Sequence, residues 1–275
     1  MTGIAAQMIT NVAGPGFVPP MLASKKRYPF VFIIDVSGST GAQPDPDINH
    51  INKAIALLID TLRNPTPSSE LQKQVDSLDI CIIAYSAAPR VIVPWSIVQN
   101  LPTAVQTLTP ETSTGTGAAI EAALQQIADR LHYYENPANQ LGSGMPHIIH
   151  LTDGAMNDMQ PGDARWNAIK QRLDNINGMA NPEKKTTAML HFVSPKGCVG
   201  GQNGNGQTLL AQLTGADTVF EMGREIASFE QLVQLITVAI TSITRNFGAQ
   251  RAPEAMRTAI DTAAANVTPP STQIY

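Results

Sequence analysis

The stretch that most constrains the fold lies near the start of the chain, where an apolar run ends abruptly in polar residues. Val31–Ile34 is β-branched and aromatic and too short for a long helix, which predicts a buried strand. Asp35, Ser37 and Ser39 follow it at alternate positions. Ligands bind at the carboxyl ends of central strands in open α/β sheets. The stretch therefore predicts an α/β domain with a site at that edge of the sheet.

The residue types at this strand end favour a hard divalent cation. The spacing of Asp35, Ser37 and Ser39 lets three side-chain oxygens converge as the chain turns. Only one of the three is charged, and such hard oxygen donors suit a magnesium-type ion better than zinc. The alternative is that Asp35 and Ser37 cap the next helix through their side-chain oxygens. The stretch by itself leaves both interpretations open.

A second strand repeats the pattern of an apolar run that ends in an acid. Residues 147–151 are mostly apolar, and Thr152, Asp153 and Gly154 follow them. Because the carboxyl ends of parallel strands meet at one edge, we expect Asp35 and Asp153 to lie together. His147 and His150 are three residues apart on this strand, so they face opposite sides and are not expected to bind one ion.

The remaining pattern predicts a mostly parallel sheet with one antiparallel edge strand. The residues at 90–93 follow the strand at 78–85 after only four residues, and a parallel crossover needs a dozen or more. Pro89 at its start places this strand at an edge. Further strands are expected at 188–193 and 218–221, and helices at 48–62, at about 118–131, from near 164, and at 229–247.

Three connecting segments carry candidate functional residues. Residues 112–117 are rich in threonine and glycine, and either a threonine caps the helix at 118–131 or a hydroxyl binds a ligand. This segment lacks the full dinucleotide fingerprint and the lysine of a P-loop. Asp158 is expected to cap the helix that begins near Ala164. Residues 135–146 are expected to form a loop, and the loop at 197–206 forms either a rim of the site or a surface without function.

Composition excludes some classes of function. The chain has 275 residues, a formal net charge of −4 and no basic stripe, so a nucleic-acid-binding surface is not expected. Lys25–Arg27 is expected to be a solvated flank. Cys81 and Cys198 form neither a disulfide framework nor a zinc ribbon, which favours a reducing compartment. No secretory signal or transmembrane stretch is recognised, so a cytoplasmic location is expected.

The chain divides into three parts by composition. Residues 1–27 form an apolar, proline-punctuated extension that either packs on a partner or on its own domain, or is disordered. Residues 28–247 are expected to form one domain. Residues 248–275 are rich in alanine, threonine and proline, and a short helix and an extended tail are expected there.

The order of the motifs resembles that of a von Willebrand factor A domain, over roughly residues 28–247. The matching blocks are the Asp-x-Ser-x-Ser run, a threonine in a Thr-x-x-Gly-x-Ala setting, and Thr152–Gly154. The resemblance implies a three-layer αβα, Rossmann-like fold with a mostly parallel six-stranded sheet and one antiparallel edge strand. It also implies a metal-ion-dependent adhesion site whose ligands are Asp35, Ser37, Ser39, Thr114 and Asp153, with Thr116 as the alternative to Thr114.

The resemblance further implies a protein-binding function. Mg²⁺, or Mn²⁺ or Ca²⁺ in its place, would be held by oxygen ligands, and a carboxylate from a partner protein would fill the open position. Val91–Pro94, and Asp158 shortly after Gly154, resemble the TerY-type domains of bacterial tellurite-resistance and stress clusters. That narrower likeness implies an adaptor that works beside kinases or phosphatases. The chain departs from it in a longer turn at 41–44 and in lacking a C-terminal zinc ribbon.

Two other functions compete with the adaptor. One is a structural or assembly subunit that binds through its termini. The other is a magnesium-dependent phosphohydrolase with Asp35 as the nucleophile, which needs a second carboxylate two residues later as a general acid. Ser37 stands at that position and no suitably placed lysine is evident, so a non-enzymatic function is expected.

Overall fold

The structure, a computed structural model, describes residues 25–41, 47–139, 141–154, 156–178, 189–193, 206–221, 229–245, 254 and 257–258. Residues 1–24, most of the glycine-rich loop at 197–206 and most of the tail from 248 onwards lie outside the described residues, as does Cys198. The division of the chain into extension, domain and tail therefore stays a prediction. None of the described helices is long and apolar enough to span a bilayer.

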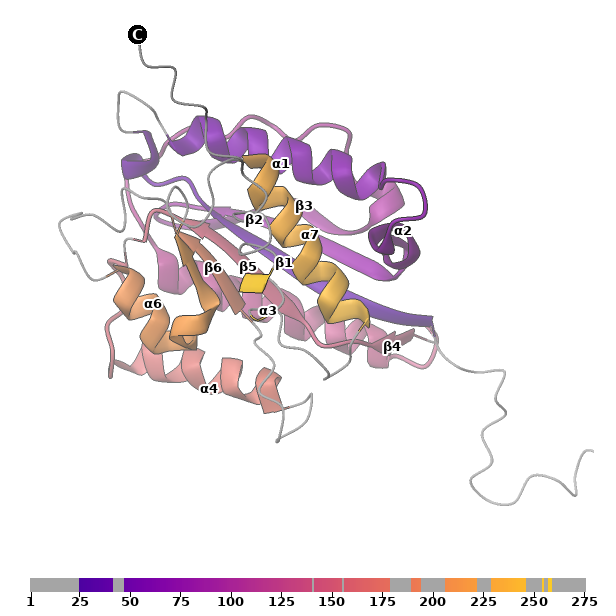
Figure 1. The fold of residues 1–275 in the computed structure, drawn as a ribbon. Helices are drawn as coiled ribbons and strands as arrows, with labels where there is room; N and C mark the ends of the chain where they lie inside the picture. The colour runs from indigo at the N-terminus through magenta and orange to yellow at the C-terminus, as the bar shows by residue number, and fades with distance from the viewer. Residues whose placement is uncertain are drawn as a thin grey trace, which may run out of the picture.

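A seven-stranded sheet forms the centre of the described part of the chain (Figure 1). The strand order is β3-β2-β1-β5-β6-β7, with the short β4 paired to β1. The strands are β1 Lys25–Asp35, β2 Leu78–Tyr85, β3 Pro89–Ile97, β4 Leu141–Ser143, β5 His147–Thr152, β6 Met189–Val193 and β7 Val219–Glu221. Neighbouring strands are parallel except β2 and β3, which confirms the antiparallel edge.

The sheet has one strand more than the six expected, because β4 lies where a loop was predicted. Its three residues pair with residues 25–27 at the start of β1. Three residues are too few to show the alternation by which a strand is recognised. β1 also begins earlier than its apolar run, at Lys25, because residues 25–27 are held in the sheet by their pairing with β4.

Helices cover both faces of the sheet, which gives the expected three layers (Figure 1). The α-helices are α1 Asp47–Arg63, α2 Glu70–Gln74, α3 Thr116–Glu135, α4 Ala164–Gly178, α6 Gly206–Thr214 and α7 Phe229–Arg245. The 3-10 turns are Gly38–Gly41, Val75–Ser77, Val98–Asn100 and Ala216–Thr218. The buried residues of α1, α2 and α7 pack on one face, and those of α3, α4 and α6 pack on the other.

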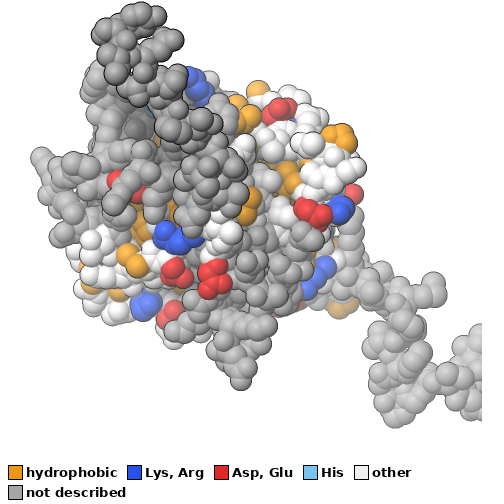
Figure 2. All heavy atoms as spheres, in the orientation of Figure 1, with side chains coloured by type: hydrophobic (Ala, Val, Ile, Leu, Met, Phe, Trp, Pro, Cys, Tyr) orange, Lys and Arg blue, Asp and Glu red, His pale blue; other side chains and the backbone are white. Residues whose placement is uncertain are grey.

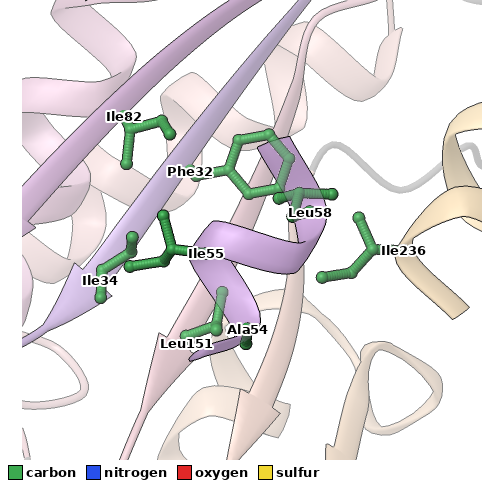
Figure 3. Close-up of a pocket in the computed structure, with 8 residues that line it drawn as sticks. All are labelled: Phe32, Ile34, Ala54, Ile55, Leu58, Ile82, Leu151 and Ile236. Atoms are coloured by element: carbon green, nitrogen blue, oxygen red, sulfur yellow. The ribbon is translucent and has the colours of Figure 1, made fainter. Parts of the chain in front are cut away.

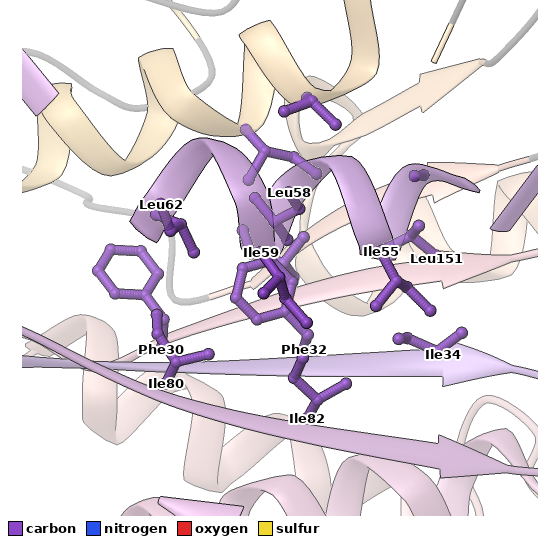
Figure 4. Packing of buried hydrophobic residues seen from close by; sticks show 14 of the residues in the cluster. Phe30, Phe32, Ile34, Ile55, Leu58, Ile59, Leu62, Ile80, Ile82 and Leu151 are labelled. Atoms are coloured by element: carbon purple, nitrogen blue, oxygen red, sulfur yellow. The ribbon is translucent and has the colours of Figure 1, made fainter. Parts of the chain in front are cut away.

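The central strand β1 contributes alternate residues to two separate apolar cores. Phe30, Phe32 and Ile34 point toward α1 (Figure 4), whereas Val31 and Ile33 belong to the core under α3 and α4. A strand that is covered on both faces has no solvent side, and this is why β1 reads as a continuous apolar run rather than an alternating one. The helix predicted at 48–62 is confirmed, and the apolar residues that recur along it at helical spacing are all buried: Ile48, Ile51, Ile55, Leu58 and Leu62.

A small cavity of about 10 Å³ lies between the sheet and helices α1 and α7 (Figure 3). Its lining is entirely apolar: Phe32, Ile34, Ala54, Ile55, Leu58, Ile82, Leu151 and Ile236. The space is at the lower limit for a single water molecule, which would find no polar partner there. This cavity is therefore a packing defect of the core and offers no binding chemistry.

A buried charge cluster lies at the amino end of the central strands. Arg27 is 5% exposed and forms an ion pair with Asp79, which is fully buried. Arg130 and the Tyr134 hydroxyl from α3 also contact the Asp79 carboxylate, with Arg130 Nε 2.8 Å from Oδ2. The expectation that Lys25–Arg27 is a solvated flank is thus wrong for Arg27. It is part of β1, and the pairing partner that buries it is far away in the sequence.

The described residues on the visible surface show no concentration of positive charge. On the face drawn in Figure 2, basic and acidic side chains of the described residues are interspersed. This distribution agrees with the formal net charge of −4. The described side chains on that face therefore give no electrostatic footprint for a polyanion.

Candidate metal site at the carboxyl edge of the sheet

The strand register brings the two predicted acids to one edge of the sheet. β1 and β5 are adjacent and parallel, with Ile34 opposite Leu151, so Asp35 ends β1 beside the end of β5 where Asp153 follows. Both side chains are buried, and burial raises the pKa of Asp35 to about 7, with the negative charge of Asp153 as the second cause. The two carboxylates are therefore close enough to interact, in an arrangement that a cation between them would stabilise.

The Asp35 carboxylate is held by hydrogen bonds to both of its oxygens. Oδ1 accepts from the Ser37 backbone N–H at 2.8 Å. Oδ2 accepts from the Thr152 hydroxyl at 2.9 Å and lies 3.2 Å from the Tyr85 hydroxyl. The bond to Ser37 lies in the turn that leads into Gly38–Gly41. Because α1 begins only at Asp47, the hydrogen bonds of Asp35 cap no α-helix.

Ser37 and Ser39 present their hydroxyls at the same point above Asp35. Their Oγ atoms are 3.0 Å apart, with Ser37 buried and Ser39 exposed. Two neighbouring ligands of an octahedral ion with bonds of about 2.1 Å lie roughly 3 Å apart. The serine pair therefore has the separation that two direct ligands of a magnesium-type ion need.

Thr114 lies in the loop that leads into α3 and is 6% exposed. The next residue anchors the loop to the end of β2, because the Gly115 N–H donates to the Ser86 carbonyl at 2.6 Å. Helix α3 begins at Thr116 without a side-chain hydrogen bond from its N-cap residue, Gly115. The Thr116 hydroxyl bonds to Tyr85 instead. The Thr116 hydroxyl is thus engaged with Tyr85, whereas Thr114 lies in the loop that precedes the helix.

The cap of α3 comes from a distant residue, which corrects the prediction for Asp158. Its carboxylate accepts from the Gly117 and Ala118 N–H groups at 2.8 and 2.9 Å, at the start of α3. Asp163 caps α4 in its place, accepting from the Trp166 N–H at 2.7 Å. The prediction for Asp158 was wrong because capping was assigned to the next helix along the chain, whereas the fold places a different helix end beside it.

Sequence reasoning missed a polar path beneath the site. The Tyr85 hydroxyl is 2.8 Å from His150 Nε2, and His150 Nδ1 is 2.9 Å from His191 Nδ1. His191 Nε2 is in turn 3.0 Å from the Thr214 hydroxyl on α6. The available signal was a histidine at the centre of each of two apolar strands. His147 is confirmed on the opposite face from His150, stacked on Phe30 with ring centroids 5.5 Å apart.

The rim of the site carries a balanced charge pair. Glu111, whose backbone forms a bridge with Ser37, pairs with Arg90 at 2.5 Å. The Ser86 hydroxyl also bonds to Glu111, and together with Arg90 it holds the pKa of this carboxyl below its usual range. The rim therefore presents neither a free cation nor a free anion from this pair.

The predicted ligand set fits a hard cation and not a zinc-type one. Among the described residues no three His, Cys, Asp or Glu side chains cluster around one point. The structure instead brings Asp35 and Asp153 to one edge of the sheet beside Ser37 and Ser39, and the loop that carries Thr114 is anchored to the end of β2. This donor chemistry suits Mg²⁺, Mn²⁺ or Ca²⁺, and the carboxylates together balance a divalent charge.

Comparisons with known proteins agree with the fold. The family model of the von Willebrand factor type A domain matches residues 30–155. No curated protein sequence matches the chain. The structure is similar to the vWF domain of the type V pili tip protein Mfa5 from Porphyromonas gingivalis, at 11% identity, with 78% of this chain and 96% of that one covered and a TM-score of 0.50.

Longer proteins are also similar over part of their length. The pilus adhesin SpaC from Lactobacillus rhamnosus GG matches at 10% identity over 79% of this chain and 30% of its own, with a TM-score of 0.52. Proximal thread matrix protein 1 from the mussel byssus matches at 14% identity over 79% of this chain and 48% of its own, with a TM-score of 0.48. The chain thus spans less than half of these two proteins. The sheet topology and the family match together give this chain a von Willebrand factor type A fold.

Proposed function

We propose that the chain is a metal-dependent protein-binding module. Asp35, Ser37, Ser39, Thr114 and Asp153 hold Mg²⁺, Mn²⁺ or Ca²⁺ at the carboxyl edge of the sheet, and an acidic side chain of a partner protein completes the coordination. The observation that carries the proposal is the meeting of Asp35 and Asp153 beneath two serine hydroxyls that are 3.0 Å apart.

The environment of each ligand supports a division of roles. Both oxygens of Asp35 already accept hydrogen bonds from the protein, so this carboxylate supplies charge from below and orients water rather than offering a bare oxygen. Ser39 is exposed, and it lies on the side from which a partner approaches. Five protein groups, some acting through water, leave room for an outside ligand in an octahedral shell of six.

The same geometry supports binding rather than hydrolysis. A nucleophilic aspartate must reach its substrate. Asp35 is fully buried with both oxygens engaged, and Ser37 cannot serve as the general acid that a phosphohydrolase needs two residues later. We therefore propose a non-enzymatic function, in line with the adhesion and interaction functions typical of the family.

Two biological settings are considered for this module. The TerY-type likeness favours a cytoplasmic stress or signalling adaptor with a kinase or phosphatase partner, and Cys81 is a buried free thiol, as a reducing compartment allows. Mfa5 and SpaC are described as pilus proteins, a setting outside the cytoplasm. Fractionation of host cells, with detection of the chain by antibody, distinguishes the two settings.

The metal site is tested by thermal unfolding with and without Mg²⁺, Mn²⁺ or Ca²⁺. A ligand that binds only the folded state at about 100 times its Kd stabilises by about 2.7 kcal/mol, which raises the Tm by roughly 5–10 °C for a chain of this size. Ser37→Ala and Asp153→Ala should lose this rise. Ser96→Ala should keep it, because the Ser96 hydroxyl bonds only to Pro94 on β3, away from the site. A wild-type Tm that does not change in millimolar metal contradicts the proposal.

Partner binding is tested by a pull-down from the native host in magnesium and in EDTA. The proposal expects a partner that is retained only in magnesium and lost with Ser37→Ala. A partner that is retained in EDTA and by the variant, but lost when the terminal segments are removed, would favour the assembly subunit instead.

A further inference from the structure

A line of hydrogen-bonded side chains crosses the sheet from the candidate metal site to α6. It runs from Asp35 on β1 through Tyr85 on β2, His150 on β5 and His191 on β6 to Thr214. Tyr85, His150 and His191 are fully buried. Burying two imidazoles in an otherwise apolar sheet has a desolvation cost. Neither histidine is a proposed metal ligand, so the ligand set alone does not explain why they are there.

The contact between the two histidines restricts where the protons lie. Their Nδ1 atoms are 2.9 Å apart, so one must carry a proton and the other must be bare. Burial lowers the pKa of His150 well below its usual range and that of His191 to about 3, so each ring is neutral near pH 7 and carries one proton. Two protons or two lone pairs at this contact would leave buried polar groups unsatisfied.

Two arrangements of the protons satisfy the contacts from Asp35 to Thr214; the Tyr85 hydroxyl also has a longer contact with the Thr152 hydroxyl, at 3.4 Å, and bonds to Thr116. In the first, Tyr85 donates to Asp35, His150 donates from Nε2 to Tyr85, His191 donates from Nδ1 to His150, and Thr214 donates to His191 Nε2. In the second, each of these bonds runs the other way: Tyr85 donates to His150, His150 to His191 and His191 to Thr214. Thr214 then donates to the Leu210 carbonyl at 3.1 Å or to Thr218 at 2.6 Å.

The charge at the metal site distinguishes the two arrangements. Asp35 Oδ2 is 3.2 Å from the Tyr85 oxygen. In the second arrangement two oxygen lone pairs face each other at this contact when the carboxylate is ionised. In the first, the phenol proton lies between them, and a hydrogen bond to a charged group is among the stronger ones. An ionised Asp35, which a cation requires, therefore selects the first arrangement.

We propose that Tyr85, His150 and His191 are positioning residues of the metal site. His150 is held as the Nε2–H tautomer and His191 as the Nδ1–H tautomer. This arrangement keeps the Tyr85 proton directed at Asp35, which fixes the carboxylate for the cation. The role toward the cation rests on the proposed function. The tautomers do not, because they follow from the hydrogen bonds of the metal-free protein once Asp35 is ionised.

The tautomers are tested on metal-free, ¹⁵N-histidine-labelled full-length chain at about pH 8, above the ordinary histidine pKa. Long-range ¹H–¹⁵N correlation spectra distinguish the two neutral forms, and His150→Gln and His191→Gln assign the signals. The proposal expects protonated Nε2 in His150 and protonated Nδ1 in His191. The reverse pair of tautomers, or a doubly protonated ring, overturns it.

The positioning role is tested by calorimetric titration of variants with magnesium chloride alone. Tyr85→Phe should bind magnesium about tenfold more weakly, because a hydrogen bond to a charged group is lost. His147→Gln is the matched control: it is buried on the same strand but outside the line, with its Nδ1 3.0 Å from the Met145 carbonyl, and its affinity should equal that of the wild type. Unchanged affinity in Tyr85→Phe overturns the role.

A third variant keeps the test decisive if Tyr85→Phe fails to fold. Thr214→Val removes the far end of the line without touching a proposed ligand, and it should shift the His191 signals and weaken magnesium binding about threefold, since hydrogen bonds in a chain polarise one another. Wild-type affinity in this variant also counts against the role. If the wild type itself binds no magnesium, the proposed function fails, while the tautomers are still decided by the metal-free spectra.

Discussion

At the scale of single residues, burial changes the proton equilibria of the groups beneath the site. Burial lowers the pKa of His147 to about 4 and that of His191 to about 3, and it lowers the pKa of His150 as well. It raises the pKa of Asp35 to about 7, with the charge of Asp153 adding to the effect. These opposite shifts set how the stability of the metal-free chain depends on pH.

We expect the free energy of unfolding to decrease as the pH falls from about 6.5 toward 4. The unfolded histidines gain protons near 6.5, whereas the buried ones stay neutral until the pH is near their lowered pKa values, so the unfolded state binds more protons. Asp35 has the opposite effect, because its pKa is about 7 in the folded state and 3.8 ordinarily, so between these pH values the folded state binds the extra proton. One carboxyl group opposes three histidines, and the histidines therefore decide the direction of the change in stability.

Urea unfolding at several pH values measures this dependence. His147→Gln should lower the slope, because one of the three histidines no longer titrates. A stability that is flat or rises as the pH falls from about 6.5 to 5 would show that the buried histidines are not kept neutral by the fold.

The buried ion pair of Asp79 should contribute far more to stability than a surface pair. Asp79→Ala leaves Arg27 and Arg130 without their shared carboxylate, and we expect a loss of about 3–5 kcal/mol. Glu70→Gln, which breaks the exposed pair with Lys73, should cost about 1 kcal/mol or less. Chemical denaturation of both variants gives the comparison, and equal losses would contradict it.

At the scale of elements, the start of α3 depends on a side chain from the segment before α4. This capping holds the helix end next to Thr114, and Gly117 is suited to the position because an added Cβ would lie 3.2 Å from the Asp158 carboxylate oxygens. Arg165 on α4 also contacts Asp158 at 3.0 Å. The two helices and the ligand loop are therefore positioned by one carboxylate.

Asp158→Ala should destabilise the chain by about 0.5–2 kcal/mol, the usual cost of removing a helix N-cap. Asp174→Ala is the control, because Asp174 is on the exposed side of α4, 4.0 Å from Lys170, and should change stability little. Urea denaturation checks both. A loss in the control as large as that in Asp158→Ala would contradict the capping role.

At the scale of the whole molecule, β1 joins the two ends of the sheet. Its last residue forms the candidate site, and its first residues pair with β4 and form the buried ion pair at the other end. The predicted boundary between residues 27 and 28 would therefore cut into a strand.

We expect a chain that begins at residue 25 to be more stable than one that begins at residue 28, by about 3–5 kcal/mol, because only the first keeps Arg27 beside Asp79. Thermal and urea unfolding of the two truncated chains measure the difference. Equal stability would show that the start of β1 contributes nothing to the domain.

Much of the fold could be predicted because it depends on local patterns. The continuous apolar runs of β1, β2 and β5 indicated strands covered on both faces, the helical spacing of apolar residues in α1 and α7 indicated amphipathic helices, and the short link before β3 required an antiparallel pair. The meeting of Asp35 and Asp153 at one edge followed from the parallel arrangement.

The remaining features depend on which distant segments become neighbours. The sequence by itself determined six of the seven strands and the acids at the carboxyl edge, since apolar runs and strand direction are properties of each segment. Only the tertiary structure decided that Arg27 is buried against Asp79, that Asp158 caps α3, and that His150 faces His191. Each of these contacts joins residues that are at least 40 positions apart along the chain. No local pattern encodes which buried polar groups will satisfy one another.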